Sequence, residues 1–209
     1  MAYINLKSNE IQMKIVYYGP ASSGKTTNLL YLYKNYSNGA DSGFITINTH
    51  GDRTLFFDYF PFDVGSVYGF NLKVQLFTVP GQDEYLATRK LVINGADGIV
   101  FVADMSASQR IKNIRALKDL HKNLVAYNKS IFRIPMVFQF NKQDLIENGM
   151  PTLPENILSQ DLNRHLKKPC YTASALNGKN VAFTLKKIIS MTSANLVSHL
   201  NWENKIEGN

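Results

Sequence analysis

The stretch that decides the fold is Gly19-Pro20-Ala21-Ser22-Ser23-Gly24-Lys25-Thr26, which matches the pattern G-x-x-x-x-G-K-[ST]. An apolar, β-branched run at 11–18 precedes it, and a run with helical character at 27–33 follows it. A strand, a glycine-containing turn and a helix in this order arrange backbone N–H groups around phosphate oxygens. We therefore expect residues 19–26 and Thr27 to bind a nucleoside triphosphate. Lys25 would reach the β- and γ-phosphates, and the Thr26 hydroxyl would hold Mg²⁺.

Strand and helix patterns alternate along the rest of the chain, which predicts an α/β fold. Strands are expected at 4–7, 11–18, 44–47, 70–78, 98–104, 136–140 and 169–172, and helices at 25–36, 107–127, 154–166 and 181–200. This order indicates a mostly parallel central sheet with helices on both faces and an extra strand at the N-terminus.

Three segments carry further information about the sheet. The run 98–103 is almost continuously apolar, which is typical of a strand covered on both faces. Residues 71–77 alternate between polar and apolar, which indicates a more exposed strand. The stretch 49–69 has no clean period; it is rich in aromatic residues and reads as a long loop that is either a partner surface or a hydrophobic flap.

Length and composition bound the class of protein. A chain of 209 residues, 44% hydrophobic and 19% charged, is expected to form one globular domain over 1–209. The net charge of +7 is scattered in sequence, so no DNA partner is expected, and acidic partners are an alternative. The lone Cys170 fits a reducing cytosol. No leader, long apolar run or lipidation signal indicates secretion or a stable membrane anchor.

A second motif points to the base of the nucleotide. Asn141-Lys142-Gln143-Asp144 follows an apolar strand, and the Asp144 carboxylate can accept hydrogen bonds from N1–H and the 2-amino group of guanine. Adenine has neither donor in that arrangement. The aliphatic stem of Lys142 suits the face of the base. The tripeptide Ser174-Ala175-Leu176 comes after the next predicted strand. It can offer a backbone N–H to the guanine 6-oxo group.

Together these residues resemble the Ras-like small GTPases, and more narrowly the bacterial MglA-type polarity and gliding GTPases. The resemblance covers nearly the whole chain and is carried by the phosphate loop, residues 51–58, residues 78–82, residues 89–91 and the guanine motif 141–144. Most small GTPases have Asp four residues before the catalytic Gln. This chain has Thr78 there, as the MglA type does. The switch I region is expected at about 49–62 and the switch II region at about 78–92.

The catalytic expectations lie in these two switch regions. Gln82 follows a Pro-Gly turn and can orient the attacking water, with Gly81 beside the phosphates. Thr54 can sense the γ-phosphate and ligate Mg²⁺ together with Thr26. Arg53 can serve as an internal arginine finger, and its alternative is a surface salt bridge. The resemblance to the MglA type implies the same three roles.

The resemblance also implies partners and a location. A homodimeric roadblock-type protein would favour the active arrangement and accelerate hydrolysis, and polarity or motility effectors would dock on the switch surface around Phe56, Phe57, Tyr59 and Phe60. The protein is expected in the cytoplasm, recruited to a cell pole. Ala21 replaces a Gly that is usual in Ras and in the MglA type, so intrinsic hydrolysis of GTP to GDP is expected to be slow.

Two alternatives stay open at this stage. The chain can be a constitutively GTP-bound docking scaffold that barely hydrolyses, which Ala21 and Thr78 leave room for. A P-loop kinase or ATPase is the more distant reading, and Asp144 argues against it.

Overall fold

A computed structural model describes residues 3–5, 8–36, 45–46, 58–67, 70–81 and 85–206 of the chain. The strands are β1 (Tyr3–Asn5), β2 (Glu10–Tyr18), β3 (Ile45–Thr46), β4 (Asp58–Val67), β5 (Phe70–Thr78), β6 (Gly98–Asp104), β7 (Met136–Asn141) and β8 (Cys170–Thr172). The helices are α1 (Lys25–Tyr36), α2 (Leu86–Ile93), the 3₁₀ turn η2 (Ala107–Gln109), α3 (Arg110–Val125), α4 (Asp144–Glu147), α5 (Glu155–Leu162) and α6 (Val181–Ile206).

All these strands join one eight-stranded sheet in the order β3-β4-β5-β2-β6-β7-β8, with β1 paired to β2. The five strands from β5 to β8 run parallel, while β4 is antiparallel to β5 and β3 to β4. The short β1 pairs antiparallel with residues 10–12 of β2, and β6 pairs with residues 15–18. The predicted α/β class, mostly parallel sheet and extra N-terminal strand are therefore confirmed.

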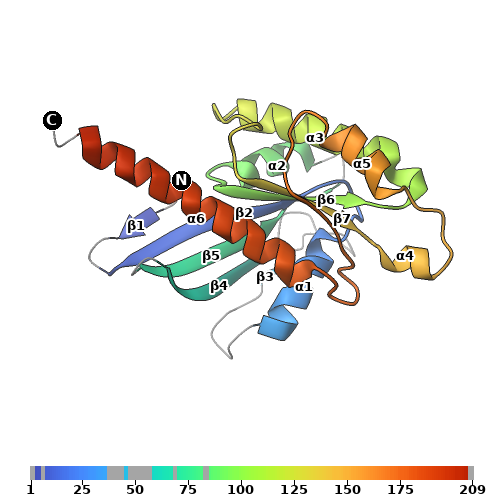
Figure 1. Ribbon diagram of the computed structural model, residues 1–209, viewed down its shortest axis with the longest axis horizontal. Helices are drawn as coiled ribbons and strands as arrows, with labels where there is room; N and C mark the ends of the chain where they lie inside the picture. The colour runs from blue at the N-terminus through green and yellow to red at the C-terminus, as the bar shows by residue number, and fades with distance from the viewer. Residues whose placement is uncertain are drawn as a thin grey trace.

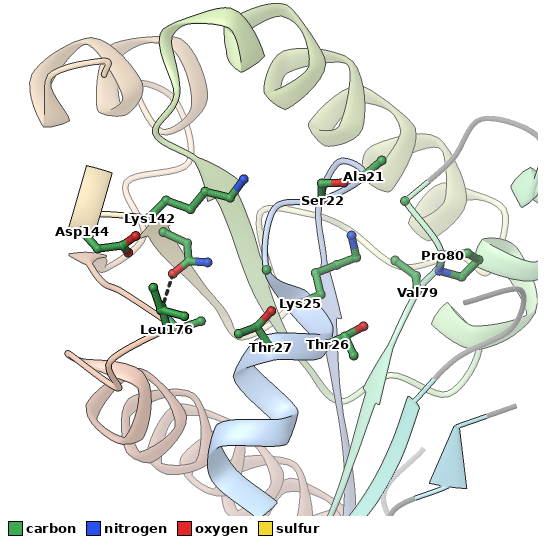
Figure 2. Close-up of a pocket in the computed structure, with 14 residues that line it drawn as sticks. Ala21, Ser22, Lys25, Thr26, Thr27, Val79, Pro80, Lys142, Asp144 and Leu176 are labelled. Carbon is green, nitrogen blue, oxygen red and sulfur yellow. Dashed lines mark hydrogen bonds between the residues drawn. The ribbon is translucent and has the colours of Figure 1, made fainter. Parts of the chain in front are cut away.

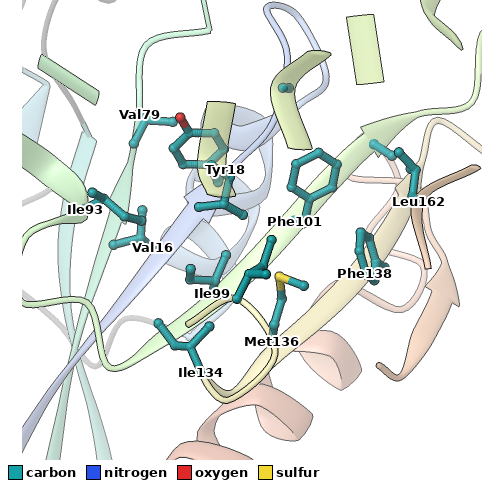
Figure 3. Close-up of a cluster of buried hydrophobic side chains, with 14 of the residues drawn as sticks. Val16, Tyr18, Val79, Ile93, Ile99, Phe101, Ile134, Met136, Phe138 and Leu162 are labelled. Carbon is teal, nitrogen blue, oxygen red and sulfur yellow. The ribbon is translucent and has the colours of Figure 1, made fainter. Parts of the chain in front are cut away.

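Helices cover both faces of the sheet, as predicted: α2, α3 and α5 lie on one face, and α1 and α6 on the other (Figure 1). Each layer packs on its own group of buried side chains. The first group includes Val92 of α2 and Leu120 of α3. Ile93 of α2 and Leu162 of α5 belong to the same group and are labelled in Figure 3. The second includes Leu29 of α1 and Ile188 of α6. Since neighbouring strand residues point to opposite faces, each central strand supplies both groups.

The strand β6 shows this double use most clearly. All seven of its residues are buried. Ile99 and Phe101 pack in the α2, α3 and α5 layer, and Val100 and Val102 in the α1 and α6 layer. In β5 exposed and buried residues alternate over most of its length. Both expectations for these strands are confirmed. Burial of each large apolar side chain contributes about 1.5–3 kcal/mol, so these strands fix the centre of the fold.

The interpretation of 49–69 as a loop is wrong for part of that stretch, because Asp58–Val67 forms β4. Pairing with β5 over Tyr59 to Val67 outweighs the poor strand preference of a sequence that contains Pro and Gly. Pro61 stands opposite Gln75, beyond the two residues that pair with β3, and the register shifts between Asp63 and Gly65. Tyr59 and Phe60 thus belong to a strand near the sheet edge, while Phe56 and Phe57 lie outside the described residues.

The helix α2 was not predicted. Its buried residues Arg89, Val92 and Ile93 have helical spacing, but the first of them is charged and the outward Leu91 is apolar and 69% exposed. Because a charged residue is buried and an apolar one is exposed, the apolar residues of this segment do not show the periodicity of an amphipathic helix. The short α4 (Asp144–Glu147) was not predicted either. The remaining helices match their expected positions, with α5 shorter and α6 longer than predicted.

Candidate functional site

The expected site residues gather at the carboxyl ends of the parallel strands, where the loops after β2, β5, β7 and β8 meet. A cavity of about 520 Å³ opens there (Figure 2), which is within the range of small-molecule sites. It is lined by Ala21, Ser22, Gly24, Lys25, Thr26, Thr27, Val79, Pro80, Gly81, Asn141, Lys142, Asp144, Ala175 and Leu176. Residues from Ala21 to Leu176, at opposite ends of this list, thus face one space.

The phosphate loop has the backbone that its sequence predicts. Gly19 and Gly24 have φ angles of +151° and +94°, and Ser22 has φ +58°. A Cβ on Gly19 would lie 2.2 Å from the Val102 carbonyl oxygen, and one on Gly24 would lie 2.2 Å from Nδ2 of Asn141. Neither position tolerates a side chain, so the loop depends on both glycines. Gly19 itself does not line the cavity; it sets the turn that leads into it.

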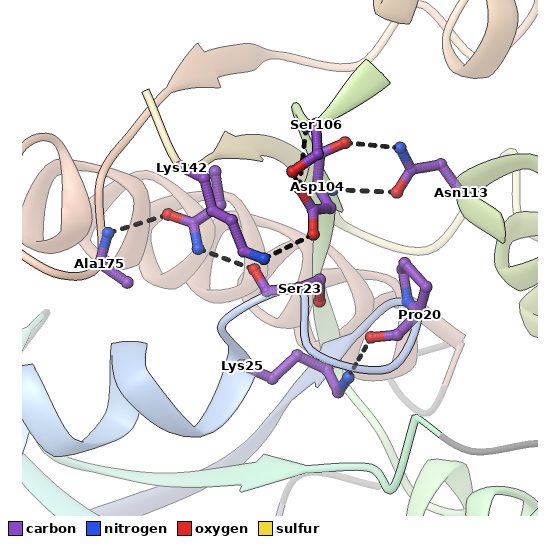
Figure 4. A network of polar contacts seen from close by, with 9 residues as sticks. Pro20, Ser23, Lys25, Asp104, Ser106, Asn113, Lys142 and Ala175 are labelled. Carbon is purple, nitrogen blue, oxygen red and sulfur yellow. Dashed lines mark hydrogen bonds and ion pairs between the residues drawn. The ribbon is translucent and has the colours of Figure 1, made fainter. Parts of the chain in front are cut away.

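Lys25 and Thr26 open α1 on the cavity wall. The Lys25 side chain is 6% exposed, and its Nζ donates hydrogen bonds to the carbonyl oxygens of Pro20 (2.6 Å) and Gly19 (3.1 Å). The ammonium group is therefore held over the loop that would surround phosphate (Figure 4). A buried ammonium group and the backbone N–H groups of a helix N-terminus suit a phosphate, and the Thr26 hydroxyl oxygen suits Mg²⁺.

The opposite end of the cavity is built from the motif 141–144. Lys142 has φ +74°, and its Nζ forms an ion pair of 2.7 Å with Oδ2 of Asp104. Asp104 is buried at the end of β6, where its Oδ1 also accepts hydrogen bonds from the backbone N–H and hydroxyl of Ser106. The carboxylate thus anchors the ammonium end of Lys142 (Figure 4), and the side chain lies along the cavity wall. Asp104 was not predicted from the sequence. A single acidic residue at the end of a buried strand could have indicated that its carboxylate pairs with a cation of the site.

Two predicted binding residues, Asn141 in the cavity lining and Ser174 outside it, brace the site through hydrogen bonds. Asn141 Nδ2 donates to the Ser23 carbonyl oxygen at 2.7 Å, and its Oδ1 accepts from the Ala175 backbone N–H at 2.9 Å. Ser174 is fully buried outside the cavity lining, and its hydroxyl donates to Oδ1 of Asp144. These bonds tie the phosphate loop to the loops after β7 and β8 and orient the Asp144 carboxylate. Because the Ala175 N–H donates to Asn141, it is already engaged inside the protein. Leu176, named in the sequence only as part of the segment 174–176, is exposed and lines the cavity.

The last side of the cavity is formed by residues that follow β5, in the segment expected to be switch II. Val79, Pro80 and Gly81 line it; the sequence marked this segment, but only Gly81 as a binding residue. Gly81 lies directly on the phosphate loop, since a Cβ there would be 2.3 Å from Ala21 Cα. Glycine is the only residue that allows this approach. Ala21 therefore borders the residue that immediately precedes Gln82.

A buried polar network supports this side from behind. Arg89 of α2 forms an ion pair of 2.7 Å with Oδ2 of Asp119 on α3 and donates to the Gly81 carbonyl oxygen at 3.4 Å. The Tyr18 hydroxyl, next to the phosphate loop, donates to the same carboxylate oxygen and accepts from Asn123. Burial, reinforced by Asp119, raises the pKa of Tyr18 far above its usual value, so the hydroxyl stays a donor.

Several expected residues are placed away from the cavity or not at all. Gln82, Arg53 and Thr54 lie outside the described residues, and Ser23 is buried behind the loop rather than lining the cavity. Burial raises the pKa of the Cys170 thiol to about 11, so it remains protonated at neutral pH.

Among the described side chains, no group of three His, Cys, Asp or Glu is arranged to hold a metal ion. None of the described helices combines the length and hydropathy that a bilayer span requires.

Comparison with known proteins gives concordant results. The model of the ADP-ribosylation factor family (Arf) matches residues 2–192. The chain is similar to the mutual gliding-motility protein MglA of Myxococcus xanthus (strain DK1622), with 39% identity over 199 residues that cover 94% of this chain and 98% of that protein. It is also similar to the Ras-related protein Rab-27B of Rattus norvegicus, with 24% identity over 184 residues, 86% of this chain and 78% of that protein.

Proposed function

The chain belongs to the Arf/Ras-like family of small GTPases, as a member of the MglA type, and on this premise we propose that it is a GTP-dependent switch controlling cell polarity and motility. Members of this family bind GTP and GDP with Mg²⁺ and hydrolyse GTP. The observation that best supports the proposal is the single cavity that joins Lys25 and Thr26 at one end to Asp144 at the other. The similarity to a gliding-motility protein supports the cellular role.

In this proposal each wall of the cavity has one task. Residues 19–27 hold the phosphates, with Lys25 as the cation and the Thr26 and Thr54 hydroxyls as protein ligands of Mg²⁺. Asp144, oriented by Ser174, accepts the two donors of guanine, and Lys142, anchored by Asp104, covers the base. When bound, Mg²⁺ neutralises charge on the β- and γ-phosphate oxygens.

Hydrolysis would require residues from both switch regions. Gln82 orients the water that attacks the γ-phosphorus, and Arg53 neutralises charge that develops on the phosphoryl oxygens. Gly81 lies against Ala21, and its carbonyl oxygen accepts a hydrogen bond from Arg89. Both contacts hold the residue that precedes Gln82 in place. We infer that intrinsic hydrolysis is slow and that a homodimeric roadblock-type partner accelerates it by stabilising the arrangement of Arg53 and Gln82.

The test is single-turnover hydrolysis of bound GTP by the isolated chain, with and without a homodimeric roadblock-type protein. Slow conversion to GDP that the partner accelerates at least tenfold is expected. No conversion under either condition would contradict the hydrolytic switch and favour the alternative, a constitutively GTP-bound docking scaffold. The contact of Ala21 with Gly81 is the observation that keeps this second reading open.

Replacing Ala21 with Gly should increase the intrinsic hydrolysis rate about tenfold, which corresponds to about 1.4 kcal/mol of transition-state stabilisation. Gly81 lies against the backbone of Ala21, and Gln82 is the next residue in the sequence, so we infer that removing the methyl group of Ala21 eases the placement of Gln82. Single-turnover rates of the two proteins measure the effect, with GDP affinity as the control for an intact site. Equal rates would remove Ala21 from the account.

The switch I aromatic residues should serve the partner rather than the nucleotide. Alanine at both Phe57 and Tyr59 should weaken partner binding about 10³-fold, since aromatic anchors at interfaces each contribute about 2 kcal/mol and every 1.4 kcal/mol is tenfold. GDP affinity should change less than about threefold. Titration calorimetry measures both. Tyr36→Ala, at an exposed aromatic residue of α1, is the matched control, and an equal loss of partner binding in that variant would contradict the assignment.

A further inference from the structure

The positive charge of the chain is concentrated in α3 and the loop after it. Residues 110–133 carry seven Lys and Arg side chains and a single carboxylate, Asp119, so they hold six of the seven net positive charges. That carboxylate is occupied by Arg89 of α2 and by Tyr18. The outward side of α3 is therefore a cationic surface in a protein whose remaining charges nearly balance.

Five exposed residues of α3, three of them cations, form a line along the helix. Ile111, Arg115, Lys118, Lys122 and Val125 are spaced by four and three residues, all are exposed, and we call them the outer stripe. This spacing puts them on one face of a helix, over about 20 Å. The opposite face, with Ala116, Leu120 and Leu124, is buried in the core. In Figure 1, α3 lies along the outside of its layer, so the stripe faces away from the sheet.

The stripe has no counter-charges of its own. Arg110 at the start of α3 is paired with Asp161, but no carboxylate of the described residues lies within ion-pair distance of Arg115, Lys118 or Lys122. Large apolar side chains accompany the cations: Ile111 and Val125 at the two ends, and Phe132 just beyond, are each more than half exposed. Lys168 adds a further cation here, since its Nζ donates to the Phe132 carbonyl oxygen.

We propose that the outer stripe of α3 docks reversibly on an anionic phospholipid surface. A convex helical face with a cationic centre and apolar ends is the pattern of interfacial binding, because fluid lipids adapt to its shape and receive the apolar side chains. A protein partner would need a preformed acidic groove. A nucleic acid backbone would not bury the apolar side chains of Ile111 and Val125. Phe132 alone is too little aromatic surface on which the bases of a single strand could stack. The absence of a second membrane signal on this face makes the docking reversible.

The expected strength follows from the number of cations. Each Lys or Arg near an anionic bilayer strengthens binding about fivefold, and the attraction weakens as salt screens it. Three stripe cations together should therefore contribute about a hundredfold. The nucleotide cavity and the β3–β4 edge involve other elements, so docking would leave the nucleotide site and the switch I strand accessible.

The experiment is vesicle flotation of the full-length chain with GDP. Phosphatidylcholine vesicles containing 30% phosphatidylserine should bind the protein, whereas phosphatidylcholine alone, or 0.5 M NaCl, should abolish binding. The variant Arg115→Gln, Lys118→Gln, Lys122→Gln should bind about a hundredfold more weakly. The control variant Lys34→Gln, Lys186→Gln, Lys187→Gln removes the same charge from α1 and α6 and should bind within about threefold of the native chain. GDP affinity, measured for both variants, confirms that they are folded.

A further variant separates lipid from other anions. Phe132→Ser keeps the charge and should weaken vesicle binding several-fold, because its ring inserts below the headgroups. Equal binding of the two triple variants, or no binding of the native chain to phosphatidylserine vesicles, would overturn the proposal. Stripe-dependent binding to duplex DNA or to polyglutamate without vesicle binding would also overturn it and assign the surface to those partners.

Discussion

Replacing Asp144 with Asn should weaken GDP and GTP binding by about 10²- to 10⁴-fold. The bond to the 2-amino group is lost and an amide N–H faces that donor instead, while the bond to N1–H loses its charge assistance. The same change should create affinity for xanthosine diphosphate. Xanthine carries a 2-oxo group where guanine has its amino group, so the Asn amide N–H can donate to it while the amide oxygen still accepts from N1–H.

The structure explains why this effect should be local. Asp144 lies at the start of the short α4 and accepts a hydrogen bond from Ser174, which the Asn side chain can also accept. Competition between a fluorescent GDP analogue and unlabelled GDP or xanthosine diphosphate measures the switch. Asp161→Asn, a carboxylate on α5 paired with Arg110, is the control and should leave GDP affinity unchanged. Undiminished GDP affinity in Asp144→Asn would remove the base-recognition role.

Replacing Arg53 with Ala should slow partner-stimulated GTP hydrolysis by about 10³-fold or more, the contribution expected of an arginine finger. GTP affinity should stay within about threefold of native, because the arginine acts on charge that develops only in the transition state. Arg53→Lys should rescue little, since an ammonium group cannot make the paired contacts of the planar guanidinium.

Single-turnover hydrolysis at saturating roadblock-type partner measures this effect, together with a direct measurement of partner binding to exclude lost docking. Arg164→Ala, an exposed arginine after α5, is the matched control. A loss smaller than tenfold in Arg53→Ala would assign Arg53 to a surface salt bridge and leave charge neutralisation to another group.

The parts of the fold that sequence predicted well are those where local pattern and tertiary burial agree. The phosphate loop, with β2 before it and α1 after it, is specified by glycine spacing and apolar runs that the structure also requires. The strand β6 was predictable because an unbroken apolar run can be satisfied only between two layers.

The parts that sequence missed are those where tertiary contacts override local preference. Pairing with β5 makes a strand of Asp58–Val67 despite Pro61 and Gly65. The helix α2 places Arg89 where an apolar residue is expected, because Asp119 on another element neutralises it. The roles of Asn141 and Ser174 as braces depend on which atoms meet in space. The surplus of cations over 110–133, by contrast, is present in the sequence and was missed because the charge was judged over the whole chain.

The most direct test of the central claim, a guanine-specific nucleotide site, is the identity of the nucleotide that the purified chain retains. Denaturation followed by chromatography identifies it, before and after loading with Mg²⁺ and an equal mixture of GTP and ATP. The account predicts GDP or GTP, with no adenine nucleotide retained from the mixture. Retention of ADP or ATP, or of no nucleotide even after loading, would contradict it, because the carboxylate of Asp144 would then not be recognising guanine.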